Sequence, residues 1–183
     1  MKAYAPLVLV GCALLPACTD NIRQAPAAQI AQQTEHSPSP DPQGLTWFAP
    51  VLHLSQYRTL FFGYDTVNYR LASADTNSGF RLLIDINYGG AVRHYDFAQL
   101  DGQSRPLSHQ RHIAERCQLF NSLISSCIYQ DLLSLDLAAA DLAQARQTGL
   151  HLQLASATLR YEALDLPANY IQGFLQGQGA AKP

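Results

Sequence analysis

The sequence is short of charged residues. Only 14% of its 183 residues are Asp, Glu, Lys or Arg, against about 25% in an average soluble protein. The formal charge of −2 leaves no basic excess for binding nucleic acid. No apolar run approaches the roughly 20 residues that a membrane-spanning helix needs, and we find no solenoid repeat. Because 48% of the residues are hydrophobic, the chain suits one globular domain.

Motifs of nucleophilic and metal-dependent catalysis are also missing. The chain contains no G-x-S-x-G elbow, no H-E-x-x-H, no S-x-x-K and no glycine-rich phosphate loop. A catalytic site can still be assembled from distant residues, so their absence favours a binding protein without excluding an enzyme.

The N-terminus has the form of a secretory signal over residues 1–17. Lys2 precedes a short apolar run, Leu7–Leu15, which matches the charged and apolar regions of such signals. The run ends in Leu15-Pro16-Ala17-Cys18, which resembles the lipobox of bacterial lipoproteins. The resemblance implies cleavage before Cys18, a diacylglyceryl group on its thiol and acylation of its new amine.

Two alternatives to lipidation at Cys18 remain open. Leu9-Val10-Gly11-Cys12 matches the same pattern but leaves a signal of only eleven residues, and Cys18 could be an ordinary cysteine after an ordinary signal. We favour Cys18, because a signal that ended before Cys12 would have little apolar region; several acyl chains on one residue then anchor the protein stably. In enterobacterial-type lipoproteins an Asp directly after the cysteine retains the protein in the inner membrane. Here Thr19 stands there, so we expect an outer-membrane lipid anchor.

A region poor in large apolar residues follows the lipobox. From Thr19 to about Gly44 the chain is rich in Gln, Ala, Pro and Ser and ends in Ser37-Pro38-Ser39-Pro40-Asp41-Pro42. This composition is typical of a flexible linker with an extended end; a Pro-rich recognition motif is the alternative. We expect the lipidated Cys18 and a flexible tether over 18–44, a single domain over 45–176 and a disordered tail over 177–183.

Strand patterns dominate the domain. Alternating apolar residues over Phe80–Tyr88 predict a strand with one buried face. Gly89-Gly90 predicts a turn, and Val92–Phe97 its hairpin partner. Further strands are expected over Tyr57–Tyr64, Thr66–Ala72, Ile128–Leu135, Leu150–Leu154 and Leu159–Leu166, with a turn at Asp101-Gly102.

Two segments have helical patterns instead. Leu137–Gln147 is Ala-rich, follows Asp136 as a possible N-cap and stops at Gly149. Pro167–Leu175 predicts a short helix with proline in its first turn. The predicted fold class is therefore mainly β (β-rich α+β), an antiparallel sandwich-like or curved sheet with one or two short covering helices.

Cys117 and Cys127 remain once Cys12 and Cys18 are assigned to the N-terminal signal and the lipid. An even pair in the oxidising cell envelope predicts a disulfide. A redox pair is the alternative, but the spacing does not resemble the C-x-x-C of thioredoxin-like sites.

His109 and His112 could suggest a zinc site together with the nearby Cys117. Residues three apart on a strand point to opposite faces, so the two histidines would converge only if the segment were helical. We interpret them as solvated loop histidines and expect no metal and no cofactor.

His94, Asp96 and Asp85 form the best candidate for general acid–base chemistry. His94 and Asp96 share a strand face, and Asp85 lies across the predicted hairpin. Polar residues on the solvated face of a sheet are far commoner, so we expect no catalytic residue here.

Tyrosine is abundant, with nine residues in the chain. Most are expected to pack at the edge of the core, and a subset on one face could bind a protein or a glycan. The domain tyrosines are Tyr57, Tyr64, Tyr69, Tyr88, Tyr95, Tyr129, Tyr161 and Tyr170.

The last third of the chain resembles small lipoproteins of Gram-negative bacteria that have no established activity. The stretches that carry the resemblance are the cysteine pair leading into Ile128-Tyr129-Gln130-Asp131, the Leu-rich strand with its Ala-rich helix and Gly149-Leu150, and the closing Leu166–Leu175. The resemblance implies an envelope location and a β-rich fold, and it carries over no catalytic residue.

These observations together predict a non-enzymatic envelope lipoprotein. We expect an interaction or assembly module that faces the periplasm, held to the outer membrane by acyl chains on Cys18, with an envelope protein as partner and no nucleic acid. A small-ligand or glycan-binding lipoprotein is the alternative, and an envelope hydrolase the third reading.

Overall fold

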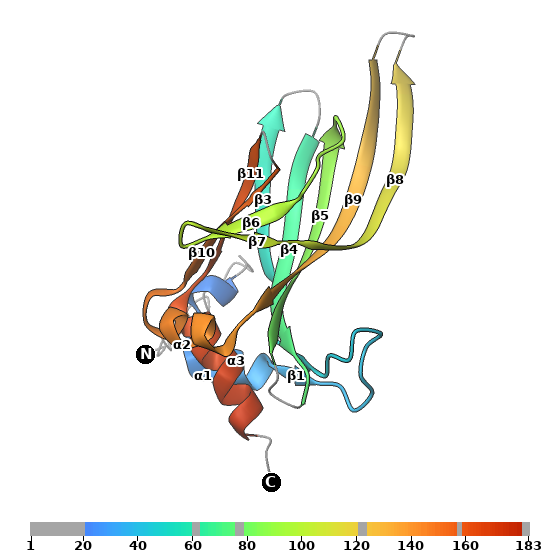
Figure 1. Cartoon of the computed structure of the whole chain (residues 1–183). Helices are drawn as coiled ribbons and strands as arrows, with labels where there is room; N and C mark the ends of the chain where they lie inside the picture. The colour runs from blue at the N-terminus through green and yellow to red at the C-terminus, as the bar shows by residue number, and fades with distance from the viewer. Residues whose placement is uncertain (1–20, 60–62, 76–78, 121–123, 157–158, 181–183) are drawn as a thin grey trace, which may run out of the picture.

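The fold consists of two antiparallel sheets with α-helices gathered at one end (Figure 1). A computed structural model describes residues 21–59, 63–75, 79–120, 124–156 and 159–180. Half of the chain is strand, so the expectation of a mainly β fold is confirmed. Among the described residues, no helix has the length and hydropathy needed to cross a membrane.

The elements follow one another along the chain with strands in the middle and helices toward both ends. They are η1 (Asn21–Gln24), α1 (Ala27–Gln33), β1 (Glu35–His36), β2 (Trp47–Phe48), β3 (Leu52–Thr59), β4 (Gly63–Ser73), β5 (Phe80–Gly90), β6 (Phe97–Leu100), β7 (Gln103–Pro106), β8 (Ser108–Phe120), β9 (Ile124–Leu137), α2 (Ala139–Thr148), β10 (Leu150–Ala155), β11 (Arg160–Leu166) and α3 (Ala168–Ala180).

The larger sheet has the order β1-β2-β4-β5-β9-β8, with β3 also paired to β4. Its central strand β5 buries every second residue from Leu82 to Tyr88, as the alternating pattern predicted. β3 pairs antiparallel with β4, but the strand expected over Tyr57–Tyr64 is placed wrongly: β3 spans Leu52–Thr59, and Gly63 and Tyr64 already belong to β4. At the edge of this sheet β8 and β9 continue beyond the ends of the other strands (Figure 1); we call residues 118–120 and 124–126 the β8–β9 arm.

The smaller sheet has the order β11-β10-β6-β7. The predicted turn at Asp101-Gly102 joins β6 to β7, and both residues have positive φ, 48° and 78°. This combination is typical of the tight turns that match strand twist. β10 and β11 pair in register from Leu150 opposite Leu166, which confirms the two C-terminal strands.

The expected hairpin between Phe80–Tyr88 and Val92–Phe97 is wrong. β5 continues through Gly90 and pairs with β9 over its whole length, with Tyr88 opposite Tyr129. The chain then leaves the sheet and enters the smaller one at Phe97. The long apolar face of β9 offers β5 a partner along its full length, which a six-residue neighbour cannot.

The segment expected as a flexible tether is folded onto the domain from residue 21. Ile30 of α1 is fully buried, and α1 packs against α3 so closely that a Cβ added at Gly173 would lie 2.5 Å from the Cβ of Ile30. One apolar residue on a short helix is enough here because glycine lets the backbones approach. The expected domain boundary at 45 is corrected accordingly.

The two C-terminal helices begin later than predicted, and α3 runs further. α2 spans Ala139–Thr148, where Asp141 accepts a hydrogen bond from the Ala138 N–H at 2.8 Å, so Asp136 is not the cap. Gly149 ends α2 with φ 81°, as expected. α3 continues through Ala180 and buries Gly177, which corrects the disordered tail over residues 177–180; residues 181–183 lie outside the described part of the chain.

Candidate functional site

A buried arginine joins the two sheets. Arg93, in the segment between β5 and β6, donates from Nη1 to Glu162 Oε1 at 2.6 Å and from Nη2 to Asp65 Oδ2 at 2.5 Å. The side chains of Arg93, Asp65 and Glu162 are 9%, 4% and 0% exposed. Asp65 belongs to β4 in the larger sheet and Glu162 to β11 in the smaller one, so the ion pairs link both layers.

This guanidinium remains charged. Burial by itself lowers the pKa of Arg93, but hydrogen bonds to Asp65 and Tyr95 outweigh it and the net direction is upward. The guanidinium carbon also lies 4.3 Å from the centre of the Tyr88 ring, a cation–π distance. Because both neighbouring carboxylates share this one cation, its first role is to hold the sheets together.

Five aromatic rings run from the smaller sheet to the edge of the larger one. Tyr161 and Tyr95 have ring centres 4.8 Å apart, Tyr95 and Tyr88 6.1 Å, and Tyr88 and Tyr129 5.3 Å. His112 stacks on Tyr129 at 5.6 Å. The row therefore begins in the core and ends at an imidazole that reaches solvent.

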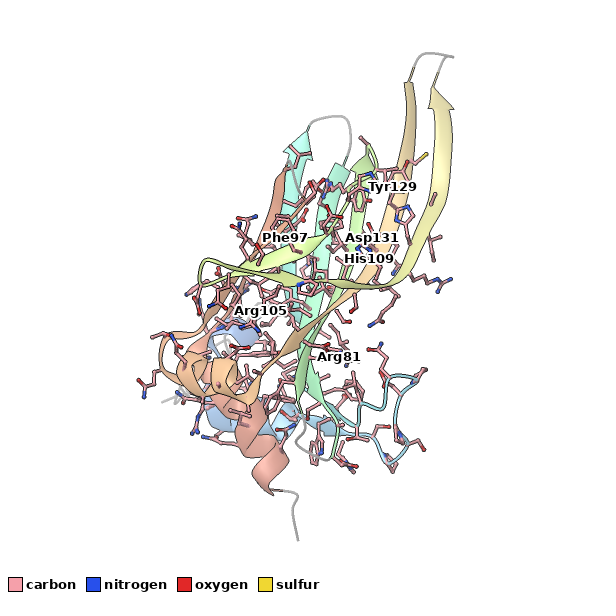
Figure 2. All side chains as sticks on the ribbon, viewed as in Figure 1. Arg81, Phe97, Arg105, His109, Tyr129 and Asp131 are labelled. Carbon is pink, nitrogen blue, oxygen red and sulfur yellow. The ribbon has the colours of Figure 1, made fainter. Side chains whose placement is uncertain are left out.

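A pocket of about 210 Å³ opens beside this last ring. Asp131 on β9 lies at its base and is 2% exposed. Its Oδ1 accepts a hydrogen bond from His112 Nδ1 at 2.5 Å, and the Tyr88 hydroxyl also interacts with this carboxylate, which contributes to the raised pKa of Tyr88. Figure 2 labels Asp131 and Tyr129 on β9. The lining residues are Val92, Arg93, His94, Tyr95, Asp96, His109, His112 and Asp131.

His109 and His112 both line this pocket, which corrects their interpretation as loop histidines. They lie on β8, where the register skips one residue, so that His109 is opposite Leu133 and His112 opposite Asp131. A β-bulge places one extra residue in β8 between the two histidines. Both side chains therefore point to the same face of the strand, although the segment is not helical. His109 Nε2 donates to the carbonyl oxygen of Tyr95 at 2.5 Å.

The expected grouping of His94, Asp96 and Asp85 does not form. His94 and Asp96 line the pocket, but they lie outside a strand. Asp85 accepts a hydrogen bond from Gln130 at 2.9 Å and lies opposite Leu132 in the register, one residue out of phase with Asp131. Since neighbouring strand residues face opposite sides, Asp85 belongs to the other face of the larger sheet.

The pocket offers hydrogen bonding but no obvious nucleophile. None of the eight residues that line it is Ser, Thr or Cys. Burial raises the pKa of Tyr88 and of Tyr95, which keeps both hydroxyls protonated. Among the described residues, no three His, Cys, Asp or Glu side chains are placed to hold a metal ion.

The described tyrosines lie in the core rather than on a binding surface. Tyr69, Tyr88, Tyr95, Tyr129 and Tyr170 are all buried, and Tyr161 is half-buried. The side chains of Tyr57 and Tyr64 lie outside the described part of the structure. The expectation that most tyrosines pack in or beside the core holds for those described.

Cys127 is disulfide-bonded. Cys117 lies directly opposite it in the β8–β9 register, and opposite residues of an antiparallel pair are within disulfide reach. A bridge between Cys117 and Cys127 therefore stays our prediction, in a register that permits it. Cys18 lies outside the described residues.

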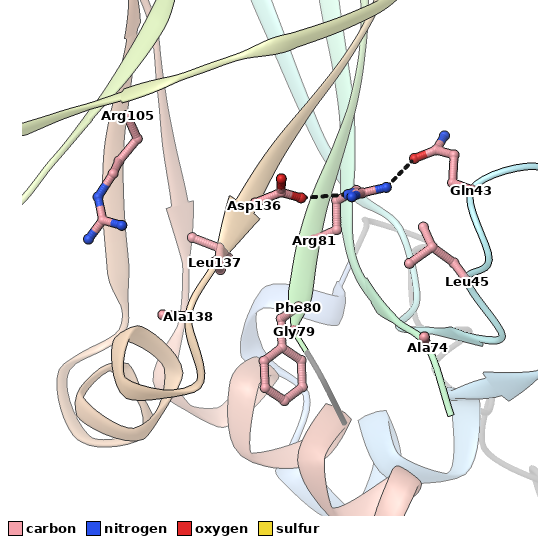
Figure 3. A pocket seen from close by; sticks show the side chains of 10 residues that line it. All are labelled: Gln43, Leu45, Ala74, Gly79, Phe80, Arg81, Arg105, Asp136, Leu137 and Ala138. Atoms are coloured by element: carbon pink, nitrogen blue, oxygen red, sulfur yellow. Dashed lines mark hydrogen bonds and ion pairs between the residues drawn. The ribbon is translucent and has the colours of Figure 1, made fainter. Parts of the chain in front are cut away.

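A larger pocket of about 520 Å³ lies where the sheet meets the helices (Figure 3). Its charged groups already have partners: Arg81 Nε donates to Asp136 at 2.7 Å and Nη1 to Gln43 at 2.9 Å, and Arg105 pairs with Asp141 at 3.4 Å. The Asp136 side chain is solvated, 73% exposed, and that of Arg81 is half-buried, 29% exposed. Nothing in this pocket is both buried and unsatisfied, so size alone does not make it the candidate site.

Four residues of this region were not predicted as site residues: Asp131, Asp65, Glu162 and Arg93. A usable signal was present, since each acid occupies the apolar phase of an alternating strand. Asp131 is in phase with Leu133 and Leu135, for example. An acid at such a position needs a buried donor, and that requirement points to Arg93 and His112.

In comparisons with family models, with curated proteins and with solved structures, no match was found. The function has to be argued from this site and from the N-terminal sequence.

Proposed function

We propose that the chain is an envelope lipoprotein, anchored through Cys18, whose domain works as a non-enzymatic interaction module. The observation that carries the proposal is Asp131: a carboxylate 2% exposed that lines an open pocket and interacts with His112 and with the Tyr88 hydroxyl. A carboxylate can accept about four hydrogen bonds, so a ligand group that supplies a further donor is favoured.

The charges around the pocket favour a ligand group that donates hydrogen bonds. Asp96 also lines it, and the nearby cation Arg93 is shared by Asp65 and Glu162. An anionic ligand would meet two carboxylates, whereas an amine, guanidinium or amide would meet a carboxylate oxygen and the row of aromatic rings. The preferred ligand group is therefore a hydrogen-bond donor.

The volume favours a side chain over a free small molecule. Sites for drug-sized ligands have volumes of about 300–1,000 Å³, and this pocket has about 210 Å³. A Lys, Arg or Asn side chain of a partner protein fits that size. The tyrosines that a glycan-binding surface would expose are buried where the structure describes them, which supports the protein partner.

The test is photo-crosslinking in living cells from Val92, at the rim of the pocket, with Val51 as the matched control. Both valines are exposed, 46% and 43%, but Val51 does not line this pocket. We expect a discrete protein adduct from Val92 that is absent from Val51. In an Asp131→Asn background, which keeps the shape and removes the charge, the adduct should be lost at unchanged abundance.

Equal adducts from both positions, or an adduct that survives Asp131→Asn, contradict the pocket as the binding site. Binding of an envelope glycan or small molecule at this pocket would contradict a partner protein and support the alternative function, a small-ligand or glycan-binding lipoprotein. Turnover of an envelope substrate by the purified domain would contradict the non-enzymatic role. The mass of the mature N-terminus, from the same cells, tests lipidation at Cys18.

A further inference from the structure

The N-terminal residues of the folded body are fixed to the domain immediately after the predicted lipid site. Arg23 in η1 donates to the hydroxyl of Tyr69 and, at 3.4 Å, to the carbonyl oxygen of Asp165. Asn169 in α3 donates to the carbonyl oxygens of Arg23 at 3.2 Å and of Ala25 at 2.6 Å. The chain is therefore bonded to the domain from about residue 23 onward.

The covalent distance to the predicted lipid site is short. Cys18 precedes Asn21, the first residue of η1, by three positions, and an extended chain covers at most about 3.3–3.6 Å per residue, or about 10 Å in all. Acyl chains hold the cysteine at the level of the lipid headgroups. Asn21 is then within about 10 Å of the headgroups. A flexible tether up to Gly44 would instead have left the whole domain free to move away from the membrane.

We infer that the helical end of the domain, made of η1, α1, α2 and α3, stands directly on the membrane surface. η1 and the helices lie together at the end opposite the β8–β9 arm (Figure 1). The inference rests on the proposed lipidation of Cys18. The headgroup layer of the bilayer contacts this end of the domain because the chain between Cys18 and η1 is short.

The composition of this end suits a headgroup layer. α1 and α3 contain no charged residue, η1 contains only Arg23, and α2 contains only Asp141 and Arg146. Asp141 pairs with Arg105 at 3.4 Å. The helical end is thus rich in uncharged amides and avoids repulsion from anionic lipids. It also lacks the Lys/Arg cluster that would bind them by charge, so the orientation depends on the covalent link.

This orientation raises the pocket and the arm away from the bilayer. β9 runs for 14 residues from the arm to the helical end, a span of about 45 Å at about 3.4 Å per residue. Asp131 lies about 20 Å along the strand from its end at Leu137. The partner of the pocket must reach it at that height, which points to a protein that projects into the aqueous compartment and away from lipid.

The experiment uses the full-length lipidated protein in vesicles of phosphatidylethanolamine and phosphatidylglycerol. A photo-crosslinking amino acid is placed at Gln24 in η1, at Gln29 in α1 or at Ile128 in β9, all of which are exposed. Adducts with phospholipid are measured by mass spectrometry. We expect lipid adducts from Gln24 and Gln29 at least several-fold above those from Ile128.

A linker variant tests whether the short link is the cause. Insertion of about twenty Gly/Ser residues after Thr19 adds a flexible segment of about 25 Å, and the adducts from Gln24 and Gln29 should fall toward the Ile128 level. Equal adducts from all positions with Cys18 acylated, or no effect of the insertion, overturn the inference alone. A mature chain without acyl groups on Cys18 overturns the proposed lipoprotein and the orientation together.

Discussion

Cys127 lies opposite Gly90 in the last register pair that joins β9 to β5. On its other side it is in register with Cys117 of β8. Beyond this point, within the described residues, the β8–β9 arm has only its own two strands. A two-stranded ribbon alone is marginally stable in water, so a disulfide at Cys127 secures the arm where the sheet ends.

We predict that Cys127 is bridged to Cys117 and that reduction destabilises the domain by about 3 kcal/mol, from a closed loop of about eleven residues. Urea unfolding with and without reductant measures the change. The variant with both Cys117→Ser and Cys127→Ser should match the reduced wild type. Peptide mapping that joins Cys127 to another cysteine would disprove the pairing.

Arg93→Met should destabilise the domain by about 3–5 kcal/mol, because it leaves Asp65 and Glu162 buried without their shared cation. Arg81→Met is the matched control, since its partner Asp136 is solvated and an exposed pair contributes about 0–1 kcal/mol. Chemical denaturation measures both variants. Equal effects would mean that the link between the sheets does not depend on Arg93.

Gly173→Ala should detach α1 from α3. The new Cβ would lie 2.5 Å from Ile30 Cβ and 2.6 Å from the Ala27 carbonyl oxygen, and both are held by packing. Gly179→Ala in the same helix meets nothing within 4 Å, and alanine is favoured over glycine in helices by up to about 1 kcal/mol.

Thermal unfolding and limited proteolysis measure this pair of variants. The first should lower Tm and expose residues 21–33 to protease, and the second should leave Tm unchanged or raised. Normal protease resistance in Gly173→Ala would show that the N-terminal segment is not packed as described.

Stability should fall above about pH 10. Burial raises the pKa of Tyr88, Tyr95 and Tyr170 in the folded protein, while the unfolded chain loses these protons near the ordinary pKa of about 10. The folded state then binds more protons than the unfolded state, so stability is complete below pH 10 and declines as pH rises toward the folded pKa values.

Each such tyrosine contributes a slope of about 1.4 kcal/mol per pH unit in that range. Chemical unfolding at a series of pH values, with tyrosinate absorbance recorded in parallel, measures this slope. Tyr95→Phe should reduce the slope by the contribution of one tyrosine. Ionisation of all tyrosines at pH 10 with the fold intact would contradict the prediction.

Local patterns predicted the elements well where one face of a strand is buried. The alternation in β5, the turn at Asp101-Gly102 and the glycine at the end of α2 were all visible, since each depends on neighbouring residues. The partner of β5 was not visible. Pairing with β9 joins residues that are 37 to 57 positions apart, from Gly90 opposite Cys127 to Phe80 opposite Leu137, and no local signal ranks such a partner above the adjacent segment.

The candidate site shows the same division. His109 and His112 were both noticed, but their position on one strand face and their neighbour Asp131 were not predicted, because a bulge in β8 changed the phase of the strand. Residues 21–44 are poor in large apolar residues and predicted a flexible linker. The buried Ile30, its close contact with Gly173 and the hydrogen bonds that Asn169 donates hold this segment to the domain. Such contacts exist only between elements far apart in the chain.

The sequence by itself determined the mainly β class, the positions of most strands and both C-terminal helices, because alternation and terminal glycines act within a few residues. It also contains Leu15-Pro16-Ala17-Cys18, the linear pattern on which the proposal of a lipoprotein rests. The tertiary structure decided which strands pair, which acids are buried and where the N-terminal segment lies. Burial of Asp65 and Glu162 depends on Arg93, which the packing of the two sheets brings between them. Burial of Asp131 depends on His112, which the pairing of β8 with β9 places opposite it.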